Sequence, residues 1–190
     1  MNVAGNSVPS SPVPAVRESF IRRSGRGVGQ AAVLLPVGLL ALVAALSGRA
    51  ASALRLLRAR AEPGGGPRPG TARLVVHAVL TALLGVLALM LVGLLVLFVA
   101  RGVLYGFVDD GPYDTSWGGP SRAGAWLAHA AVSCPIAVAA TALLYGLAGL
   151  HRRVTAPLRG ERRGGWVLPT VWLGCLAGAL FLVAFVRQLN

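Results

Sequence analysis

The sequence predicts an all-α membrane protein, a small bundle of four transmembrane helices joined by short loops. Of the 190 residues, 55% are hydrophobic and only 13% are charged. The mean hydropathy is +0.69, well above that of soluble domains. A helix needs about 20 apolar residues to cross a bilayer, and four runs meet that requirement. They are Val28–Ser47, Leu74–Ala100, Ala123–Leu150 and Trp166–Phe185.

The chain divides into a tail and one transmembrane domain. Residues 1–27 are basic and begin with a stretch rich in Ser, Pro and small residues, which predicts a flexible tail. Residues 28–190 are expected to form a single domain. After the first run, "SGRAASALRLLRARAE" has helical composition and is expected either to continue the first helix or to lie on the lipid surface. "PGGGPRPG" over residues 63–70 then predicts a flexible turn.

The second, third and fourth runs contain no formally charged residue, which supports their assignment as transmembrane helices. Between Arg73 and Arg101 lie 27 residues without a formal charge. The third run is long enough to tilt or to extend past the lipid. Prolines lie inside three runs, where membrane helices tolerate kinks when neighbouring helices satisfy the freed carbonyl groups. They are Pro36, Pro135 and Pro169.

Arginine distribution predicts the orientation of the bundle. The loops over residues 48–73 and 151–165 together carry 11 Arg against two Glu, so the positive-inside rule places both in the cytoplasm. The loop over residues 101–122, which contains three Asp, is then external. This arrangement also places the N-terminal tail outside although it carries four Arg. The first run could instead be a shallow or re-entrant element.

Several function classes find no support in the sequence. The net charge of +12 comes from 18 Arg at the ends of apolar runs, without the interleaved aromatic residues of a nucleic-acid surface. Cys134 and Cys175 lie in separate apolar runs and form no zinc or redox motif. The group Asp109, Asp110 and Asp114 is more typical of a solvated loop than of a calcium site. We therefore expect no enzyme activity, no metal and no cofactor.

The stretch "YDTSWGGPSRAGAW" is the polar, aromatic and turn-rich insert between the second and third runs. Its aromatic residues suit a membrane interface, and its Gly-Gly-Pro turn predicts an ordered loop. Both glycines could adopt positive φ, and the proline could start the next helix. The predicted recognition residues are Tyr113, Asp114, Trp117, Gly118, Gly119, Pro120, Trp126 and His129.

His129 and its neighbours carry the sharpest expectation for this loop. Trp126 and His129 are three residues apart and share a helix face. We expect Trp117 or Trp126 to pack near His129, and the imidazole to be neutral and bonded to a neighbouring helix. A ligand-binding or pH-sensing role is the alternative for this histidine.

The segment from this loop to "GLHRRVTAPLRG" resembles the membrane sensor region of actinobacterial two-component histidine kinases and of related stand-alone membrane proteins. There a Trp-Gly-Gly-Pro turn leads into a span that ends in a Leu-His-Arg-like cytoplasmic segment. The matching positions are Trp117, Gly118, Gly119, Pro120, Gly124, Trp126, His129, Leu150, His151 and Arg152. The family usually begins with two spans where one is found here. It also continues into a kinase, where this chain has a fourth span.

The resemblance implies a sensor-like or signalling-accessory membrane protein without its own kinase domain. Its cytoplasmic coupling residues would be His151, Arg152 and Arg153. The alternative is a structural or assembly subunit of a larger membrane complex. The expected partners are the lipid bilayer and either other membrane proteins or further copies of the chain, and no nucleic acid. Small residues that could line helix contacts are Ser133, Ala137 and Thr141 in the third run and Gly174 and Gly178 in the fourth.

Overall fold

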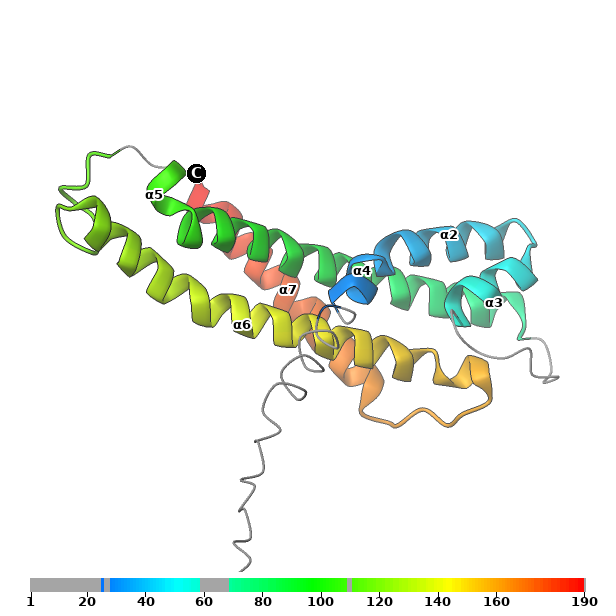
Figure 1. Ribbon diagram of the computed structural model, residues 1–190. Helices are drawn as coiled ribbons and strands as arrows, with labels where there is room; N and C mark the ends of the chain where they lie inside the picture. The colour runs from blue at the N-terminus through cyan, green and yellow to red at the C-terminus, as the bar shows by residue number, and fades with distance from the viewer. Residues whose placement is uncertain (1–24, 26–27, 59–68, 109–110, 190) are drawn as a thin grey trace, which may run out of the picture.

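The regular elements of the protein are helices, as Figure 1 shows. The structure, a computed structural model, describes residues 25, 28–58, 69–108 and 111–189, and none of these forms a strand. The predicted all-α class is therefore confirmed. Apart from residue 25, the predicted tail lies outside the described residues, as does the turn over residues 63–68. The elements are α2 (Leu34–Leu46), α3 (Ala50–Arg58), α4 (Thr71–Phe98), the π-helical turn η1 (Val99–Val103), α5 (Tyr105–Val108), α6 (Arg122–Val154), the 3₁₀ turn η2 (Ala156–Arg159) and α7 (Val167–Leu189).

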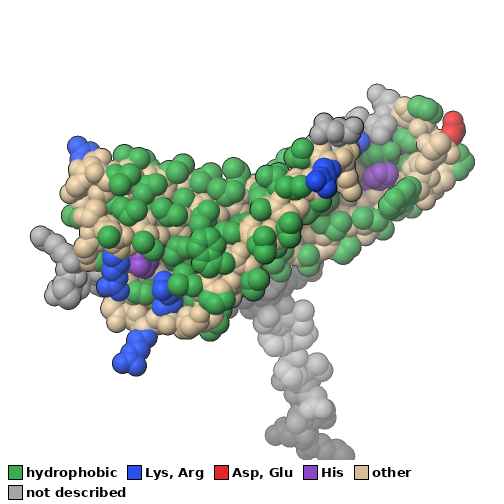
Figure 2. Space-filling view, turned by 180° about the vertical axis from the view of Figure 1, so that it is seen from behind, with side chains coloured by type: hydrophobic (Ala, Val, Ile, Leu, Met, Phe, Trp, Pro, Cys, Tyr) green, Lys and Arg blue, Asp and Glu red, His purple; other side chains and the backbone are tan. Residues whose placement is uncertain are grey.

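Among the residues that the structure describes, three helices are long and apolar enough to cross a membrane. They are Thr71–Val103, which joins α4 to η1, then Arg122–Val154 and Val167–Gln188. The first two have 33 residues each, which gives each a length of about 50 Å at 1.5 Å per residue. This length exceeds the thickness of a hydrocarbon core, which is about 30 Å. Hydrophobic side chains cover most of the face between the two ends of the molecule (Figure 2). By length and composition, the chain is a multi-pass membrane protein with spans close to three of the predicted runs.

The predicted fourth span, over residues 28–47, is not confirmed. Residues 28–32 are helical, but a turn at Val33 separates them from α2. Pro36 explains the break, because it has no N–H to donate to the carbonyl group of Ala32 and its ring crowds that carbonyl. The 13 residues of α2 extend about 20 Å, which is too short to cross the hydrocarbon core alone.

Close contact with α4 holds α2 in place. A Cβ atom at Gly38 would lie 2.5 Å from the backbone nitrogen of Ala82, and one at Gly85 would lie 2.3 Å from that of Leu35. Small residues allow such backbone contact between membrane helices. The result is that α2 lies along the half of α4 nearest Thr71, as Figure 1 shows.

The predicted helix after the first run is confirmed as α3, but it does not continue α2. Gly48 adopts a φ of +74° between the two helices, which reverses the chain. Ala53 and Leu57 of α3 are buried against Leu74 of α4 and Leu158 of η2. This α3 is therefore packed onto the bundle by its apolar face.

The long helices place the two ends of the molecule. Helices α4 and α6 lie side by side and antiparallel, and α7 crosses them on one face (Figure 1). One end carries α3 and the loop between η2 and α7, and the other carries α5, the loop from residue 111 to 121 and the C-terminus. Gly174 and Gly178 of α7 face Leu87 of α4, so these predicted contact residues lie inside the bundle.

Candidate functional site

The loop that joins α5 to α6 is folded by its own hydrogen bonds. The Ser116 amide donates to the Tyr113 carbonyl at 2.9 Å, and the Gly119 amide donates to the Ser116 carbonyl at 3.0 Å. The Ser121 hydroxyl accepts a bond from the Gly124 amide at 3.1 Å and so caps α6. The helix begins at Arg122 and its N-cap residue is Ser121. Pro120 therefore does not start the helix as predicted.

The two glycines of the turn have different roles. Gly119 has a φ of +87°, as predicted, with open space around it. Gly118 is instead required by contact, because a Cβ atom there would lie 1.8 Å from the carbonyl oxygen of Gly124. The backbone of the loop thus rests directly on the first turn of α6, and any side chain at Gly118 would separate them.

Aromatic and charged side chains fix the start of α6 to the end of the preceding span. The Trp126 Nε1–H donates to the Val103 carbonyl at 2.9 Å, and its indole meets the Phe107 ring edge-on at 5.2 Å. The Arg122 guanidinium donates to the Gly106 carbonyl. These bonds satisfy carbonyl groups near η1 and α5 that the irregular helix end would leave open.

His129 is held on both sides. Its Nδ1–H donates to the Ala125 carbonyl at 2.8 Å, one turn back in its own helix, and its ring stacks on Tyr105 at 3.9 Å with an interplanar angle of 8°. The predicted bond to a neighbouring helix is wrong, because that contact is aromatic. Since Nδ1 carries the donated proton, Nε2 is the acceptor in a neutral ring.

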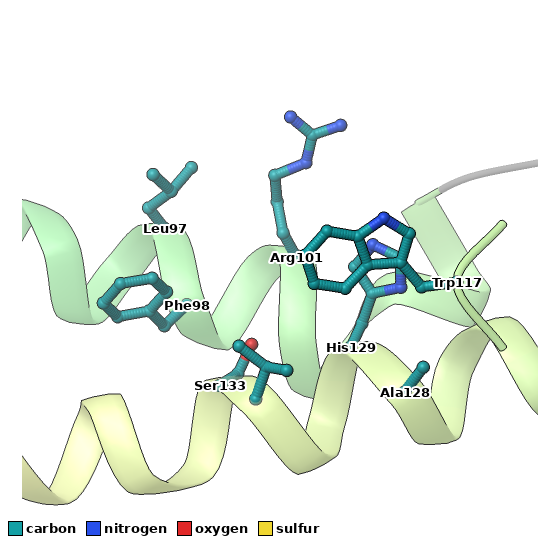
Figure 3. A pocket seen from close by; sticks show the side chains of 8 residues that line it. Leu97, Phe98, Arg101, Trp117, Ala128, His129 and Ser133 are labelled. Carbon is teal, nitrogen blue, oxygen red and sulfur yellow. The ribbon is translucent and has the colours of Figure 1, made fainter. Parts of the chain in front are cut away.

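A cavity of about 280 Å³ lies between the end of the α4–η1 span and α6, next to the loop. Figure 3 shows Arg101 and Phe98 on one side, His129 and Ser133 on the other, and Trp117 reaching in from the loop. The complete lining is Leu97, Phe98, Arg101, Trp117, Ala128, His129, Val132 and Ser133. The walls are mostly apolar and include the His129 imidazole and the Ser133 hydroxyl, whereas the Arg101 guanidinium points away from both (Figure 3).

The π-helical turn positions one side of this cavity. The Leu104 amide donates to the Val99 carbonyl, five residues back, at 3.0 Å. Turns of this kind are rare in proteins, and many of those that occur lie at functional sites. The turn places Gly102 against Ser133, whose Cβ would lie 2.2 Å from a Cβ on the glycine. This contact brings η1 close to α6 beside the cavity and confirms Ser133 as a helix-contact residue.

The structure brings together only part of the predicted recognition set. Trp117 and His129 line the cavity, although the Trp117 side chain is 88% exposed. Trp126 is half-buried and lies beside α5, and Tyr113 packs near Tyr105 with ring centroids 6.5 Å apart. Asp114 and Pro120 are exposed.

Sequence reasoning missed Arg101 and Tyr105 as site residues. In the sequence Arg101 marks only the end of an apolar run, and Tyr105 is only one of several interfacial aromatic residues. No spacing in the sequence links Tyr105 to His129, because their contact joins different helices. Within residues 25, 28–58, 69–108 and 111–189, no group of three or more His, Cys, Asp or Glu side chains could hold a metal ion.

The predicted coupling residues lie at the opposite end of α6. The His151 carbonyl accepts from the Thr155 amide at 3.0 Å, and the Arg152 carbonyl accepts from the Arg159 guanidinium at 2.9 Å. Arg153 lies over the Trp166 ring, 4.9 Å from its centroid, which is within cation–π range. These contacts join the end of α6 to η2 and to the start of α7.

An ion pair joins Arg159 of η2 to Glu161 in the loop that follows. Arg159 bonds Glu161 at 2.9 Å, and this hydrogen bond, with the charge of the guanidinium, lowers the pKa of the Glu161 carboxyl below its usual value. Glu161 is the only acidic residue after Asp114. The nearby Arg152 and Arg153 therefore receive no charge neutralisation from the loop.

Comparison with known proteins assigns no family to this site: no family model matches the chain, and neither a curated protein nor a solved structure is significantly similar to it.

Proposed function

We propose that the chain is a sensor-like or signalling-accessory membrane protein, and that its outer Trp-Gly-Gly-Pro loop is the recognition element. The observation that carries the proposal is the cavity beside this loop, which Trp117, Arg101 and His129 line from three segments. An exposed indole at the mouth of a preformed cavity is a common feature of recognition sites, since a large rigid ring gains contact area at low entropic cost.

The orientation of the bundle is part of the proposal. The loops over residues 48–73 and 151–165 face the cytoplasm, and the loop over residues 101–122 is external, in accordance with the positive-inside rule. The described ends of both arginine-rich loops lie at the same end of the molecule, because α4 and α6 are antiparallel neighbours. If the first run does not cross the membrane, the N-terminal tail lies on the side of the loop over residues 48–73, and its arginines then agree with this orientation.

Helix α6 offers the connection between the two ends. It runs without interruption for 33 residues, from the loop contact at Gly124 to Arg152 and Arg153. A change of position at the cavity would be transmitted along one continuous helix, which contains Pro135, to its other end. The Arg-rich loop over residues 151–165 is the proposed contact with a cytoplasmic signalling partner.

Site-specific photocrosslinking tests the proposal. A photoreactive phenylalanine analogue is introduced at Trp117, at the mouth of the cavity, and at Thr115, an exposed control on the same loop. We expect capture of a defined envelope molecule from position 117 and not from position 115. A blank at both positions across growth conditions would contradict the recognition role.

The alternative, a structural or assembly subunit, is favoured by one observation. The last three turns of α7 expose large apolar side chains, namely Leu180, Phe181, Leu182, Val183 and Val186. Such a face can receive another membrane protein as readily as lipid. Native mass measurement after mild detergent extraction separates the two functions, because a fixed complex with a larger protein indicates an assembly subunit.

A further inference from the structure

A second and larger cavity lies at the arginine-rich half of the bundle, away from the outer loop. It is a groove of about 820 Å³ between α4, α6 and α7. Its floor is apolar, with Leu87 and Leu91 from α4, Leu147 from α6 and Phe181 from α7. The groove is therefore large enough for a drug-sized or lipid-sized ligand.

Four glycine residues, which have no side chains, keep the groove open. Gly146 and Gly149 line it from α6 and Gly174 and Gly178 from α7. A Cβ atom at either α6 glycine would meet nothing within 4 Å, so the space beside them is not filled by neighbouring residues. Helix α7 packs on α4 through Val167 and Val171, which are buried in one cluster with Leu80 and Leu84, and through Gly178 against Leu87; the groove opens beside these contacts.

One end of the groove is cationic. Arg152, Arg153 and Trp166 line it there, and the Arg153 guanidinium lies over the Trp166 ring. Arginine side chains are concentrated at the end of the molecule that carries α3 and the loop after η2 (Figure 2). Glu161 bonds Arg159, and within the part of the chain that the structure describes neither Arg152 nor Arg153 forms an ion pair. Tryptophan and arginine are the residues typical of the membrane surface.

We propose that this groove binds one anionic phospholipid from the leaflet on the arginine-rich side of the membrane. The phosphate lies between Arg152 and Arg153, and an acyl chain follows the apolar floor past Leu87 toward Phe181. Charge complementarity selects this occupant: an apolar groove with a cationic mouth matches an anionic headgroup attached to hydrocarbon.

A second copy of the chain fits the groove less well. Copies inserted in the same orientation carry Arg152 and Arg153 at the same depth, so a symmetric contact at this face brings like charges together. A zwitterionic lipid fills the floor but leaves the two arginines without an anion. The anionic lipid is the occupant that satisfies both parts of the groove.

Fluorescence quenching by brominated lipids tests the proposal on the full-length chain. Two single-tryptophan proteins are prepared: one keeps Trp166 at the mouth of the groove, and the other keeps Trp172, which is 61% exposed and does not line it. Each is reconstituted in phosphatidylcholine vesicles in which either brominated phosphatidylglycerol or brominated phosphatidylcholine is the minor lipid. We expect phosphatidylglycerol to quench Trp166 preferentially, and both lipids to quench Trp172 equally.

Paired substitutions identify the arginines responsible. R152Q/R153Q should lower the phosphatidylglycerol preference at Trp166 roughly fivefold for each arginine removed. R162Q/R163Q removes the same charge from the adjacent loop, outside the groove, and should retain most of the preference. Equal quenching of Trp166 by both lipids, or equal losses in the two double variants, would overturn the proposal.

A second measurement covers the case in which the single-tryptophan proteins do not fold. Ala177 lines the groove. Ala179, which is also exposed, lies two residues further along α7, on the opposite face and outside the groove. Native mass spectrometry should detect bound phosphatidylglycerol on the wild-type chain and on A179W, and much less on A177W. Retained lipid on A177W would contradict the site, as would a dimer that A177W alone disrupts, since that result would assign the groove to a second copy.

Discussion

Replacement of Gly118 by alanine should detach the outer loop from α6. In the wild-type chain a Cβ atom at this position would lie 1.8 Å from the Gly124 carbonyl oxygen and 2.5 Å from the Ala125 nitrogen, both backbone atoms. Because such contacts are not found below 3.0 Å, the loop must move away by more than 1 Å. Helix backbone cannot yield as a flexible side chain would. Overpacking of this kind costs about 1–3 kcal/mol.

The neighbouring glycine provides the control. Gly119 has positive φ but open space, so G119A introduces backbone strain of about 1 kcal/mol without a collision. A second control, G165A, adds a methyl group where nothing lies within 4 Å. A comparison of the three variants therefore separates a collision from strain and from a simple change of composition.

Hydrogen exchange measured by mass spectrometry reports the loop directly. The Ser116 and Gly119 amides are bonded within it, and the Gly124 amide is bonded to the Ser121 cap. In G118A these amides should exchange about fivefold to one hundredfold faster. In G119A the increase should be smaller, and G165A should match the wild type. Exchange in G118A equal to the wild type would refute the packing of the loop on α6.

Three further predictions concern stability. L84A removes a fully buried side chain from the centre of α4 and should lower the free energy of unfolding by about 2–5 kcal/mol. L89A, on the exposed face, should lower it by less than about 0.5 kcal/mol. Thermal unfolding in detergent compares the two variants. W126F removes an indole hydrogen bond to a backbone carbonyl and should cost about 1 kcal/mol by the same assay. The hydrogen bond and charge of Arg159 lower the pKa of Glu161, so the ion pair should persist at neutral pH and be lost as pH falls through that lowered pKa. The loop after η2 should then lose protection from exchange, measured relative to the intrinsic exchange rate at each pH; unchanged protection in acid would contradict this pair.

The long helices could be predicted because their evidence is local. The uncharged run between Arg73 and Arg101 is sufficient to predict α4, since an apolar run of this length is typical of a membrane-spanning helix. Composition is less informative for the first apolar run. It predicts a span there, but a single proline in the first half of the run interrupts the helix. Composition counts apolar residues but takes no account of the position of Pro36, which lacks a backbone N–H donor.

The candidate site was only partly predictable. The Gly-Gly-Pro turn correctly indicated an ordered loop, but contact with Gly124, which depends on tertiary structure, decides why Gly118 must be glycine. The stacking of Tyr105 on His129 joins different helices, and the π-helical turn that bears Arg101 has no sequence signature. Contacts between elements, unlike those within a turn, are set by packing and had to be seen in the structure.

The side of the membrane that each end faces is the central claim, because the loop can recognise an envelope molecule only if it is external. In a chain whose Cys134 and Cys175 are replaced by alanine, single cysteines are introduced at Thr115 and at Arg162, both exposed. Intact cells are then treated with a membrane-impermeant maleimide. We predict labelling of T115C in intact cells and labelling of R162C only after the membrane is permeabilised. Labelling of R162C but not T115C in intact cells would contradict the orientation and, with it, the proposed recognition role.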